Sequence, residues 1–143
     1  MTLSVFPDVN VWLALSYPAH SHHPPALRWF QTLDDATVFY FCRTTQLSLF
    51  RLLTTEAVMS RDVFTQLQCW TLFDRWIGSR KARLAAEPSG LDSILRSCTN
   101  QGASSPKAWA DAYLAAFAEA GGLTLVTFDR ALASKSSGSV LLS

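Results

Sequence analysis

Residues 3–8, Leu-Ser-Val-Phe-Pro-Asp, near the start of the chain, give the strongest indication of the fold. A short apolar run that stops at a proline and an acid is typical of a buried strand that ends just before a helix. The expected helix covers residues 10–17, and Pro18 ends it. The sequence therefore begins with a strand whose last residues, Pro7 and Asp8, lead directly into a helix.

The same alternation of strands and helices continues along the chain. Residues 37–42 are rich in aromatic and β-branched residues without polar alternation, as a strand covered on both faces requires. Because strands that alternate with helices build a parallel sheet, we predict an α/β fold: a three-layer α/β/α sandwich with a central parallel sheet of four or five strands. Further strands are expected over 83–86, 123–127 and 139–142, and helices over 26–33, 46–53, 62–78, 91–98, 128–132 and from Ser105-Pro106 to Gly121-Gly122.

Composition limits the classes of function. The chain has 143 residues, of which 49% are hydrophobic, and this fits one domain over 1–143. Charged residues make up 16% and the net charge is +1, so no global positive field draws the protein onto nucleic acid. Any binding of nucleic acid must come from a local patch of side chains.

The cysteines and the apolar runs indicate the compartment. Cys42, Cys69 and Cys98 are odd in number and form no CxxC pair, which argues against a disulfide framework and a structural zinc site. No apolar run reaches the roughly 18 to 20 residues of a membrane span, and the first residues lack the basic start of a secretory signal. We therefore expect a soluble, cytoplasmic protein that does not associate with a membrane.

Two aspartates directly follow expected strands. Asp8 comes after the first strand and Asp129 after the strand at 123–127. In a parallel sheet the functional crevice lies at the carboxyl ends of the strands, so acids in these positions are candidates for chemistry. Aspartate is also a favoured helix N-cap, and capping alone would explain either residue taken singly.

Asp111 is harder to explain by capping, because it lies beyond the first turn of a helix that starts at Ser105-Pro106. Around that helix Asp111 falls beside further apolar residues, so the helix is expected to be apolar nearly all round and buried. An ionised carboxylate there needs a partner, which a salt bridge, protonation of the acid or a bound cation would each provide. The apolar stripe on the other side of the helix consists of Trp109, Ala112, Tyr113, Ala116, Phe117 and Ala120.

Three carboxylates at one sheet edge would repel one another, by roughly 3 kcal/mol for a pair ~5 Å apart at an effective dielectric constant of ~20. A divalent cation removes this repulsion. Oxygen-only ligands suit Mg²⁺, or Mn²⁺, rather than zinc. We therefore predict that Asp8, Asp111 and Asp129 are metal ligands and catalytic residues, and that the bound Mg²⁺ activates a water for attack on a phosphodiester.

The stretches that carry these acids resemble the three acidic motifs of PIN-domain nucleases, in family order. They are residues 8–13 (Asp-Val-Asn-Val-Trp-Leu), 111–118 (Asp-Ala-Tyr-Leu-Ala-Ala-Phe-Ala) and 125–129 (Leu-Val-Thr-Phe-Asp). The chain length and residues 44–52 most resemble the VapC toxins of toxin–antitoxin pairs. The resemblance implies a Mg²⁺-dependent endoribonuclease with RNA as substrate, commonly a homodimer, inhibited by a small antitoxin protein whose tail reaches into the acidic pocket.

The chain departs from that family at one position. A fourth acid is common there on the helix after the second strand, and the matching residue here is Gln46. Glu56 lies farther along the chain, and we do not expect it to take the place of this fourth acid. Gln46 can offer a carbonyl oxygen to a metal or its water but brings no charge, so we predict one metal ion, held more weakly than in four-acid relatives. The alternative is a degenerate PIN domain that binds RNA or a protein partner without cleaving.

Several nearby residues are candidates for supporting roles. Asn10 and Thr127 are expected to orient the metal or the substrate, although Thr127 also fits an ordinary strand residue. Arg43 and Arg51 are candidates for binding a substrate phosphate, with salt bridging as the alternative. Asp8-Val9-Asn10 lacks the Asp-x-Asp pair that a haloacid-dehalogenase-like phosphatase requires, and the chain has no glycine-rich phosphate loop.

Three clusters of side chains elsewhere in the sequence, a group of three histidines, a basic run and an aromatic cluster, each have two interpretations. The histidines are interpreted as a surface segment rather than a metal site, and the basic run as a solvated helix end or a track for an RNA backbone. The aromatic cluster is interpreted as core or a dimer surface rather than a base-stacking platform. These clusters are His20, His22 and His23; Arg75, Arg80, Lys81 and Arg83; and Trp70, Phe73, Trp76 and Ile77.

Overall fold

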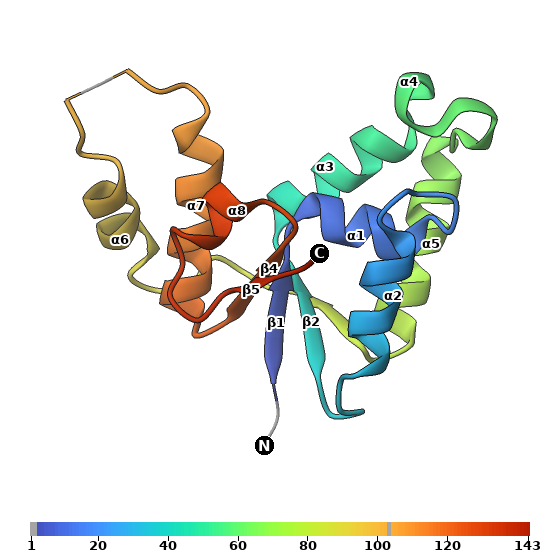
Figure 1. Cartoon of the computed structure of the whole chain (residues 1–143), viewed down its shortest axis with the longest axis horizontal. Helices are drawn as coiled ribbons and strands as arrows, with labels where there is room; N and C mark the ends of the chain where they lie inside the picture. Colours follow the sequence, from blue (N-terminus) through green and yellow to red (C-terminus); the bar gives the residue numbers. More distant parts are fainter. Residues whose placement is uncertain (1–2, 103) are drawn as a thin grey trace.

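The computed structural model describes residues 3–102 and 104–143 and has the predicted α/β architecture. Figure 1 shows a central sheet with helices on two sides. The strands are β1 (Ser4–Pro7), β2 (Val38–Phe41), β3 (Ala82–Leu84), β4 (Thr124–Thr127) and β5 (Val140–Leu141). The helices are α1 (Val9–Ser16), α2 (His23–Gln31), α3 (Arg43–Leu53), α4 (Glu56–Met59), the 3₁₀ turn η1 (Ser60–Asp62), α5 (Gln66–Gly78), α6 (Leu91–Cys98), α7 (Ala108–Gly121) and α8 (Arg130–Ala133).

The five strands are all parallel and lie in the order β3-β2-β1-β4-β5. β1 is central, with Val5 opposite both Phe39 of β2 and Thr124 of β4. Because the strands are parallel, the residues that follow β1, β2 and β4 emerge at one edge of the sheet. That edge, at the top of Figure 1, is the place where the sequence analysis expected the acids.

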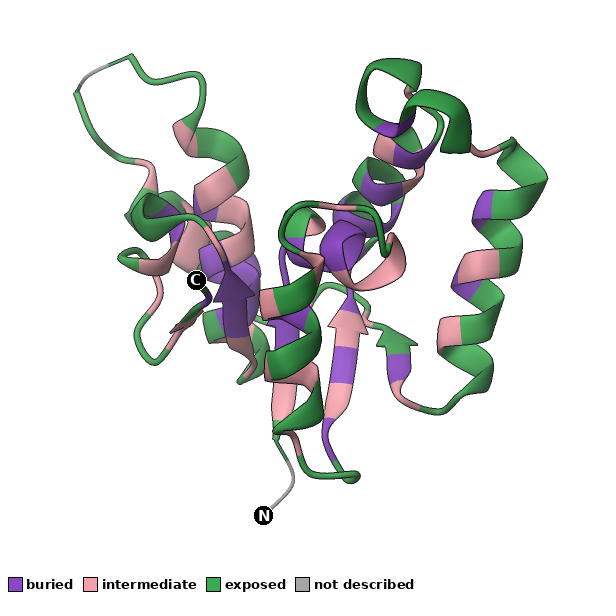
Figure 2. Cartoon of the chain, turned by 45° about the vertical axis from the view of Figure 1, so that its right-hand side comes forward, coloured by how far each residue is buried: buried purple, intermediate pink, exposed green. Residues whose placement is uncertain are grey.

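The alternation of side chains along the strands separates two layers of core. Val5 and Val126 pack on the face that α1, α2, α3 and α5 cover. Phe6 and Leu125 point to the other face, where Phe6 stacks on Phe117 of α7 with ring centroids 4.9 Å apart. Figure 2 shows buried residues in the strands and on the inner sides of the helices, with exposed residues along the outer sides of the helices. The three-layer sandwich with a parallel sheet is therefore confirmed.

Two helices begin earlier than the sequence predicts. α2 begins at His23 rather than after the proline pair, because prolines are tolerated in the first turn, where backbone N–H groups have no helical partner. α3 begins at Arg43, directly after β2, and not at Gln46. Glu56 begins the separate short helix α4 and does not belong to α3, which ends at Leu53.

The start of α7 is a larger correction. The expected capping serine and first-turn proline at Ser105-Pro106 form a turn instead, in which the carbonyl oxygen of Ser105 accepts a 3.1 Å hydrogen bond from the backbone N–H of Ala108. Lys107 occupies the N-cap without a side-chain capping bond. Asp111 therefore lies in the first turn of α7. Trp109, expected in the apolar stripe, is 62% exposed.

Two further features concern the length of the helices and the state of the cysteines. Over residues 3–102 and 104–143, no helix combines the length and the apolar character needed to cross a lipid bilayer. The cysteines carry free thiols, with Cys42 and Cys69 buried and Cys98 exposed.

Candidate active site

Asp8 follows β1 directly and is the N-cap of α1. Its Oδ1 atom accepts a 3.1 Å hydrogen bond from the backbone N–H of Val11, and its Oδ2 atom accepts one from the hydroxyl of Thr127. The residue is only 5% exposed. Capping and a functional role are therefore compatible here, because the cap uses one carboxylate oxygen and the bond to a neighbouring strand uses the other.

Thr127 connects the ends of β1 and β4. It is the last residue of β4, and it is fully buried. Its hydroxyl donates to Asp8, while its Oγ1 atom accepts a 2.9 Å hydrogen bond from the backbone N–H of Asp129. Thr127 thus hydrogen-bonds to both strand-end acids, and one side chain positions the two of them.

Asp129 is the N-cap of α8 and has an exposed side chain. Its Oδ1 atom accepts hydrogen bonds from the backbone N–H groups of Ala131 at 2.8 Å and Leu132 at 3.3 Å. The Oδ2 atom takes no part in these capping bonds. The capping of α8 thus fixes the side chain and leaves one oxygen to face an incoming ligand.

The electrostatics of Asp8 favour a positive partner. Burial raises the pKa of the Asp8 carboxyl above its ordinary value, and the negative charge of Asp129 raises it further. Hydrogen bonds from Thr127 and from the backbone N–H groups of Val11 and Asn10 act in the opposite direction. Keeping the carboxylate ionised in this setting calls for a cation nearby.

Asp111 is not held in the same way. Its side chain is 31% exposed, and its Oδ2 atom lies 3.9 Å from Nζ of Lys135. The expectation of a buried acid on a helix that is apolar on all sides is wrong, since α7 begins later and Asp111 lies near its exposed N-terminus. No three His, Cys, Asp or Glu side chains in the described residues are already arranged around one metal position. The structure brings Asp8 and Asp129 together, and Asp111 as third ligand stays a prediction.

Gln46 is fully buried in the first turn of α3. Its Oε1 atom accepts a 2.6 Å hydrogen bond from Nη1 of Arg43. A guanidinium group only donates hydrogen bonds, so this contact fixes the orientation of the amide. The Nε2 atom is then a buried donor with no partner among the residues that the structure describes. Gln46 thus presents an N–H group, which suits an anionic oxygen, where the sequence analysis expected a carbonyl oxygen for a metal.

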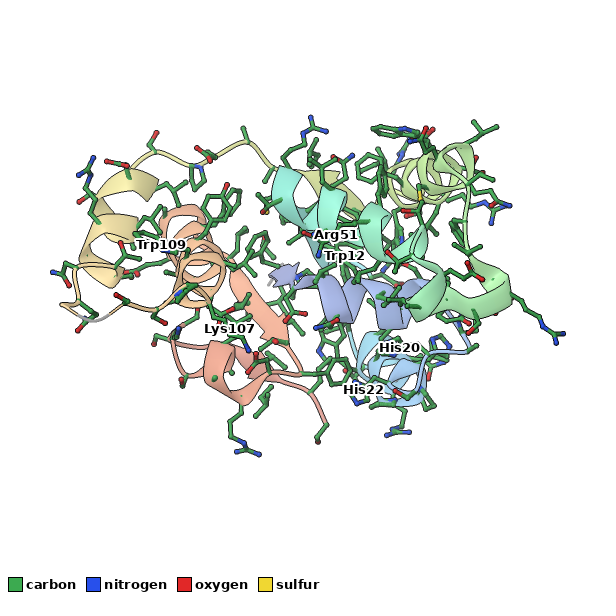
Figure 3. All side chains as sticks on the ribbon, turned by 90° about the horizontal axis from the view of Figure 1, so that it is seen from above. Trp12, His20, His22, Arg51, Lys107 and Trp109 are labelled. Atoms are coloured by element: carbon green, nitrogen blue, oxygen red, sulfur yellow. The ribbon has the colours of Figure 1, made fainter. Side chains whose placement is uncertain are left out.

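The remaining candidates lie around these groups. The side chain of Asn10 is exposed on the first turn of α1, and only its backbone N–H acts on Asp8. Arg43 and Arg51 are both exposed on α3. Figure 3, seen from above the carboxyl ends of the strands, places Arg51 on one side of these ends and Lys107 on the other.

The histidine segment reaches the edge of this site, which the sequence analysis missed. The ring of His22 stacks on Phe128, next to Asp129, with centroids 4.4 Å apart. His20 accepts a 3.0 Å hydrogen bond from the backbone N–H of His22, and burial lowers the pKa of the His20 imidazole, as do the charges of the other two histidines. His23 bonds through Nδ1 to the carbonyl oxygen of Ala14 at 2.7 Å. No local pattern links residue 22 to residue 128, so the contact could not be predicted.

The basic run lies away from the acids. Arg80, Lys81 and Arg83 surround the start of β3, at the edge of the sheet opposite to Asp8 and Asp129. Lys81 Nζ contacts the backbone oxygen of Asp35 at 3.3 Å. These residues are a solvated end of the molecule and not part of the acidic site.

The aromatic cluster on α5 divides between core and surface. Phe73 is buried, and Trp76 packs edge-on against Trp12 and donates a 3.1 Å hydrogen bond to Ser16. Trp70 is 46% exposed on the outer side of α5.

Comparison with known proteins adds independent findings. No family model matches the chain. The chain is 41% identical over 128 residues to Ribonuclease VapC41 of Mycobacterium tuberculosis (strain H37Rv), covering 87% of this chain and 88% of that protein.

Two solved structures share the fold. One is VapBC2 from Rickettsia felis bound to a DNA fragment from their promoter, with a TM-score of 0.66, 12% identity and 97% of each chain covered. The other is VapC20 of Mycobacterium tuberculosis, a toxin that cleaves the sarcin-ricin loop, with a TM-score of 0.61, 14% identity, and 91% of this chain and 93% of that chain covered.

Proposed function

Because the chain belongs to the VapC family of PIN-domain ribonucleases, we propose that it is a Mg²⁺-dependent endoribonuclease and the toxin of a toxin–antitoxin pair. Asp8, Asp111 and Asp129 hold the cation, for which Mn²⁺ is an alternative. RNA is the substrate, and the free thiols and the RNA substrate together favour the cytoplasm as its compartment.

The observation that carries the proposal is the buried carboxylate of Asp8 beside Asp129. The protein keeps one acid almost fully buried and places a second acid close enough to raise its pKa. Such an arrangement is costly for a protein without a positive partner. Its donors are oxygen atoms only, from two carboxylates and a hydroxyl, and this is the donor set that Mg²⁺ prefers.

The chain's own residues then have distinct tasks. Thr127 positions the two strand-end acids, and Asp111 completes the ligand set from α7. The Nε2 atom of Gln46 donates to an anionic oxygen of the substrate, while Arg43 holds the amide in place and Arg51 binds a neighbouring phosphate. When bound, Mg²⁺ supplies an acidified water and neutralises charge on the phosphoryl oxygens.

The direct test is cleavage of a fluorescently labelled RNA by the purified chain, in Mg²⁺ and in excess EDTA. Cleavage is expected in Mg²⁺ or Mn²⁺ alone, and Asp8→Asn and Asp129→Asn are each expected to abolish it. Asp92→Asn is a matched control, because Asp92 pairs with Arg96 on the exposed surface of α6. Full cleavage in EDTA, or in the Asp8→Asn variant, would contradict the proposal.

A homodimer and a small antitoxin protein are the proposed protein partners. An exposed apolar patch on α3 and α5 suits the dimer, with Leu47 54% exposed, Leu67 76% exposed and Trp70 packed edge-on against Phe50. Exposed apolar patches of this kind mark interfaces. Light scattering should give the mass of a dimer for the unmodified chain and of a monomer for Leu67→Asp; a monomeric unmodified chain would rule out this interface.

The Arg43–Gln46 pair favours a second candidate function. A neutral amide bound to arginine stands where a fourth acid is common, so the site carries less negative charge for the cation. A chain that binds RNA or a protein partner without cutting it would fit this observation. RNA binding without cleavage at saturating Mg²⁺ and Mn²⁺ would support this second function and exclude the first.

A further inference from the structure

Trp109 is unusual among the tryptophans of the chain. Its side chain is 62% exposed on the first turn of α7, whereas Trp12 is fully buried and Trp76 donates its indole N–H to Ser16. Trp70, the other strongly exposed tryptophan, packs edge-on against Phe50 and Phe73. A large aromatic ring left in solvent beside a functional site indicates a surface that binds something flat and partly apolar.

Trp109 lines a cavity of about 920 Å³, which we call the α7 cavity. It is formed by the end of α6, residues 99, 101 and 104–106, the first turns of α7 and Lys135. This volume falls in the range of pockets that bind small organic groups. Its wall carries both methyl groups and hydrogen-bonding side chains, among them Thr99, Gln101, Ser104 and Ser105.

Lys135 joins the α7 cavity to the candidate active site. The same lysine lines the cavity and lies 3.9 Å from the carboxylate of Asp111. Asp111 itself is on the same helical turn as Trp109. In Figure 3, Trp109 and Lys107 are both on the α7 side of the strand ends, with Trp109 toward α6 and Lys107 toward α8. The cavity therefore adjoins the predicted third metal ligand and has Lys135 at its border.

We propose that the α7 cavity is a nucleobase subsite, in which the indole of Trp109 stacks on one unpaired base of single-stranded RNA and Lys135 contacts the adjoining phosphate. The proposal rests on the proposed function and specifies the substrate as unpaired RNA. The positive charge of Lys135 at the border favours a polyanion over a basic peptide. Every base has a flat face, so stacking on tryptophan holds a base without demanding one sequence, while the amide and hydroxyl groups of the wall can read its edge.

The proposal is tested by the affinity of a single-stranded RNA for the Asp8→Asn chain in Mg²⁺, a background expected to leave the RNA intact. Fluorescence anisotropy of a labelled oligonucleotide should show that Trp109→Ala weakens binding roughly tenfold or more, and that Trp109→Phe restores part of the loss. RNA should quench tryptophan fluorescence, and the quenching should be largely absent in Trp109→Phe. Equal affinity for RNA in the Asp8→Asn chain and its Trp109→Ala variant would overturn the proposal and leave a protein segment as the occupant.

A series of oligonucleotides with one abasic nucleotide at successive positions identifies the stacked base. One abasic position should weaken binding to the chain that carries Trp109, and the same change should have no further effect once Trp109 is alanine. Lys135→Met should also weaken binding, whereas Lys81→Met is a matched control at the opposite edge of the sheet. Additive losses at every abasic position would contradict stacking on Trp109.

Cleavage kinetics separate this proposal from the proposed function. In an otherwise unmodified chain, Trp109→Ala should raise KM while leaving kcat within a few-fold. Normal cleavage with an unchanged KM would overturn the subsite and leave the nuclease standing. Trp109-dependent RNA binding without any cleavage would support the subsite and overturn the nuclease.

Discussion

Asp8 and Asp129 are held at the ends of neighbouring strands, whereas Asp111 is held at the start of a helix that follows a long connection. Asp8 is almost fully buried with both oxygens hydrogen-bonded, and the Thr127 hydroxyl fixes its distance from Asp129. Asp111 is about one-third exposed, and its carboxylate lies 3.9 Å from Nζ of Lys135.

The two sides of the site are therefore preorganised to different degrees. The strand ends are positioned by ladders of backbone hydrogen bonds on both sides, so their acids are preorganised before any ligand arrives. The first turn of α7 has no capping side chain and is free to adjust to the cation and the RNA. We expect substitutions on the strand side (Asp8, Thr127 and Asp129) to alter stability and chemistry together. Substitutions on the helix side (Asp111) should alter chemistry and binding alone.

The largest effect is expected at Asp8. Asp8→Asn removes a charge from the cation site, while the amide oxygen can still cap α1. Because changes even to residues outside the ligand shell cost about 10–100-fold, RNA cleavage should fall by more than about 100-fold. The measurement is kcat/KM at saturating Mg²⁺, with circular dichroism as the check on folding. A loss of less than tenfold would place the cation elsewhere.

Thr127 tests the link between the two strand-end acids. Thr127→Val keeps the shape of the side chain but removes the donor to Asp8 and the acceptor for the backbone N–H of Asp129. Mg²⁺ affinity should fall by about 10–100-fold and the free energy of unfolding by about 1–3 kcal/mol. Thr127→Ser, which keeps the hydroxyl, should retain most of both; equal losses in the two variants would mean that the hydroxyl has no positioning role.

Substitutions on the two sides should differ most in how they change the free energy of unfolding in the absence of metal. In EDTA, Asp8→Asn should stabilise the chain by on the order of 1 kcal/mol, because a buried carboxylate next to Asp129 loses its charge. Asp111→Asn should change stability by no more than about 0.5 kcal/mol, as is usual for exposed pairs. Urea unfolding of the three proteins measures this, and equal changes in both variants would remove the distinction between the sides.

Gln46 gives the smallest expected effect. Gln46→Glu adds a carboxylate, so Mg²⁺ binding measured by calorimetry should become stronger, but only a few-fold, because Arg43 already holds the atom at this position. Arg43→Met combined with Gln46→Glu should strengthen binding further. If neither variant binds Mg²⁺ more tightly than the unmodified chain, Gln46 does not belong to the cation site.

The sequence allowed the strand side of the site to be predicted and left the helix side largely hidden. Asp8 and Asp129 follow strands whose apolar runs are local signals, and parallel pairing brings strand ends to one edge without further information. The start of α7 depends instead on the path of the chain from α6. The local capping pattern at Ser105-Pro106 was overridden there, and with it the expected burial of Trp109 and Asp111.

Contacts between distant segments were also beyond local reasoning. The stacking of His22 on Phe128 joins a loop to the end of β4, and no sequence pattern in either segment predicts this contact. The Arg43–Gln46 pair is local, but it was hidden by the error in the start of α3, which placed Arg43 outside the helix. Sequence patterns within one helix or strand predicted that element, whereas the orientation of polar side chains could be read only from the folded structure.

Calorimetric titration with Mn²⁺ shows whether Asp8, Asp111 and Asp129 hold one divalent cation together. We predict one site for each unmodified chain, and loss of most of the measured affinity in each of the variants Asp8→Asn, Asp111→Asn and Asp129→Asn. Unchanged Mn²⁺ affinity in Asp111→Asn would show that the helix side takes no part in holding the ion and would contradict the account.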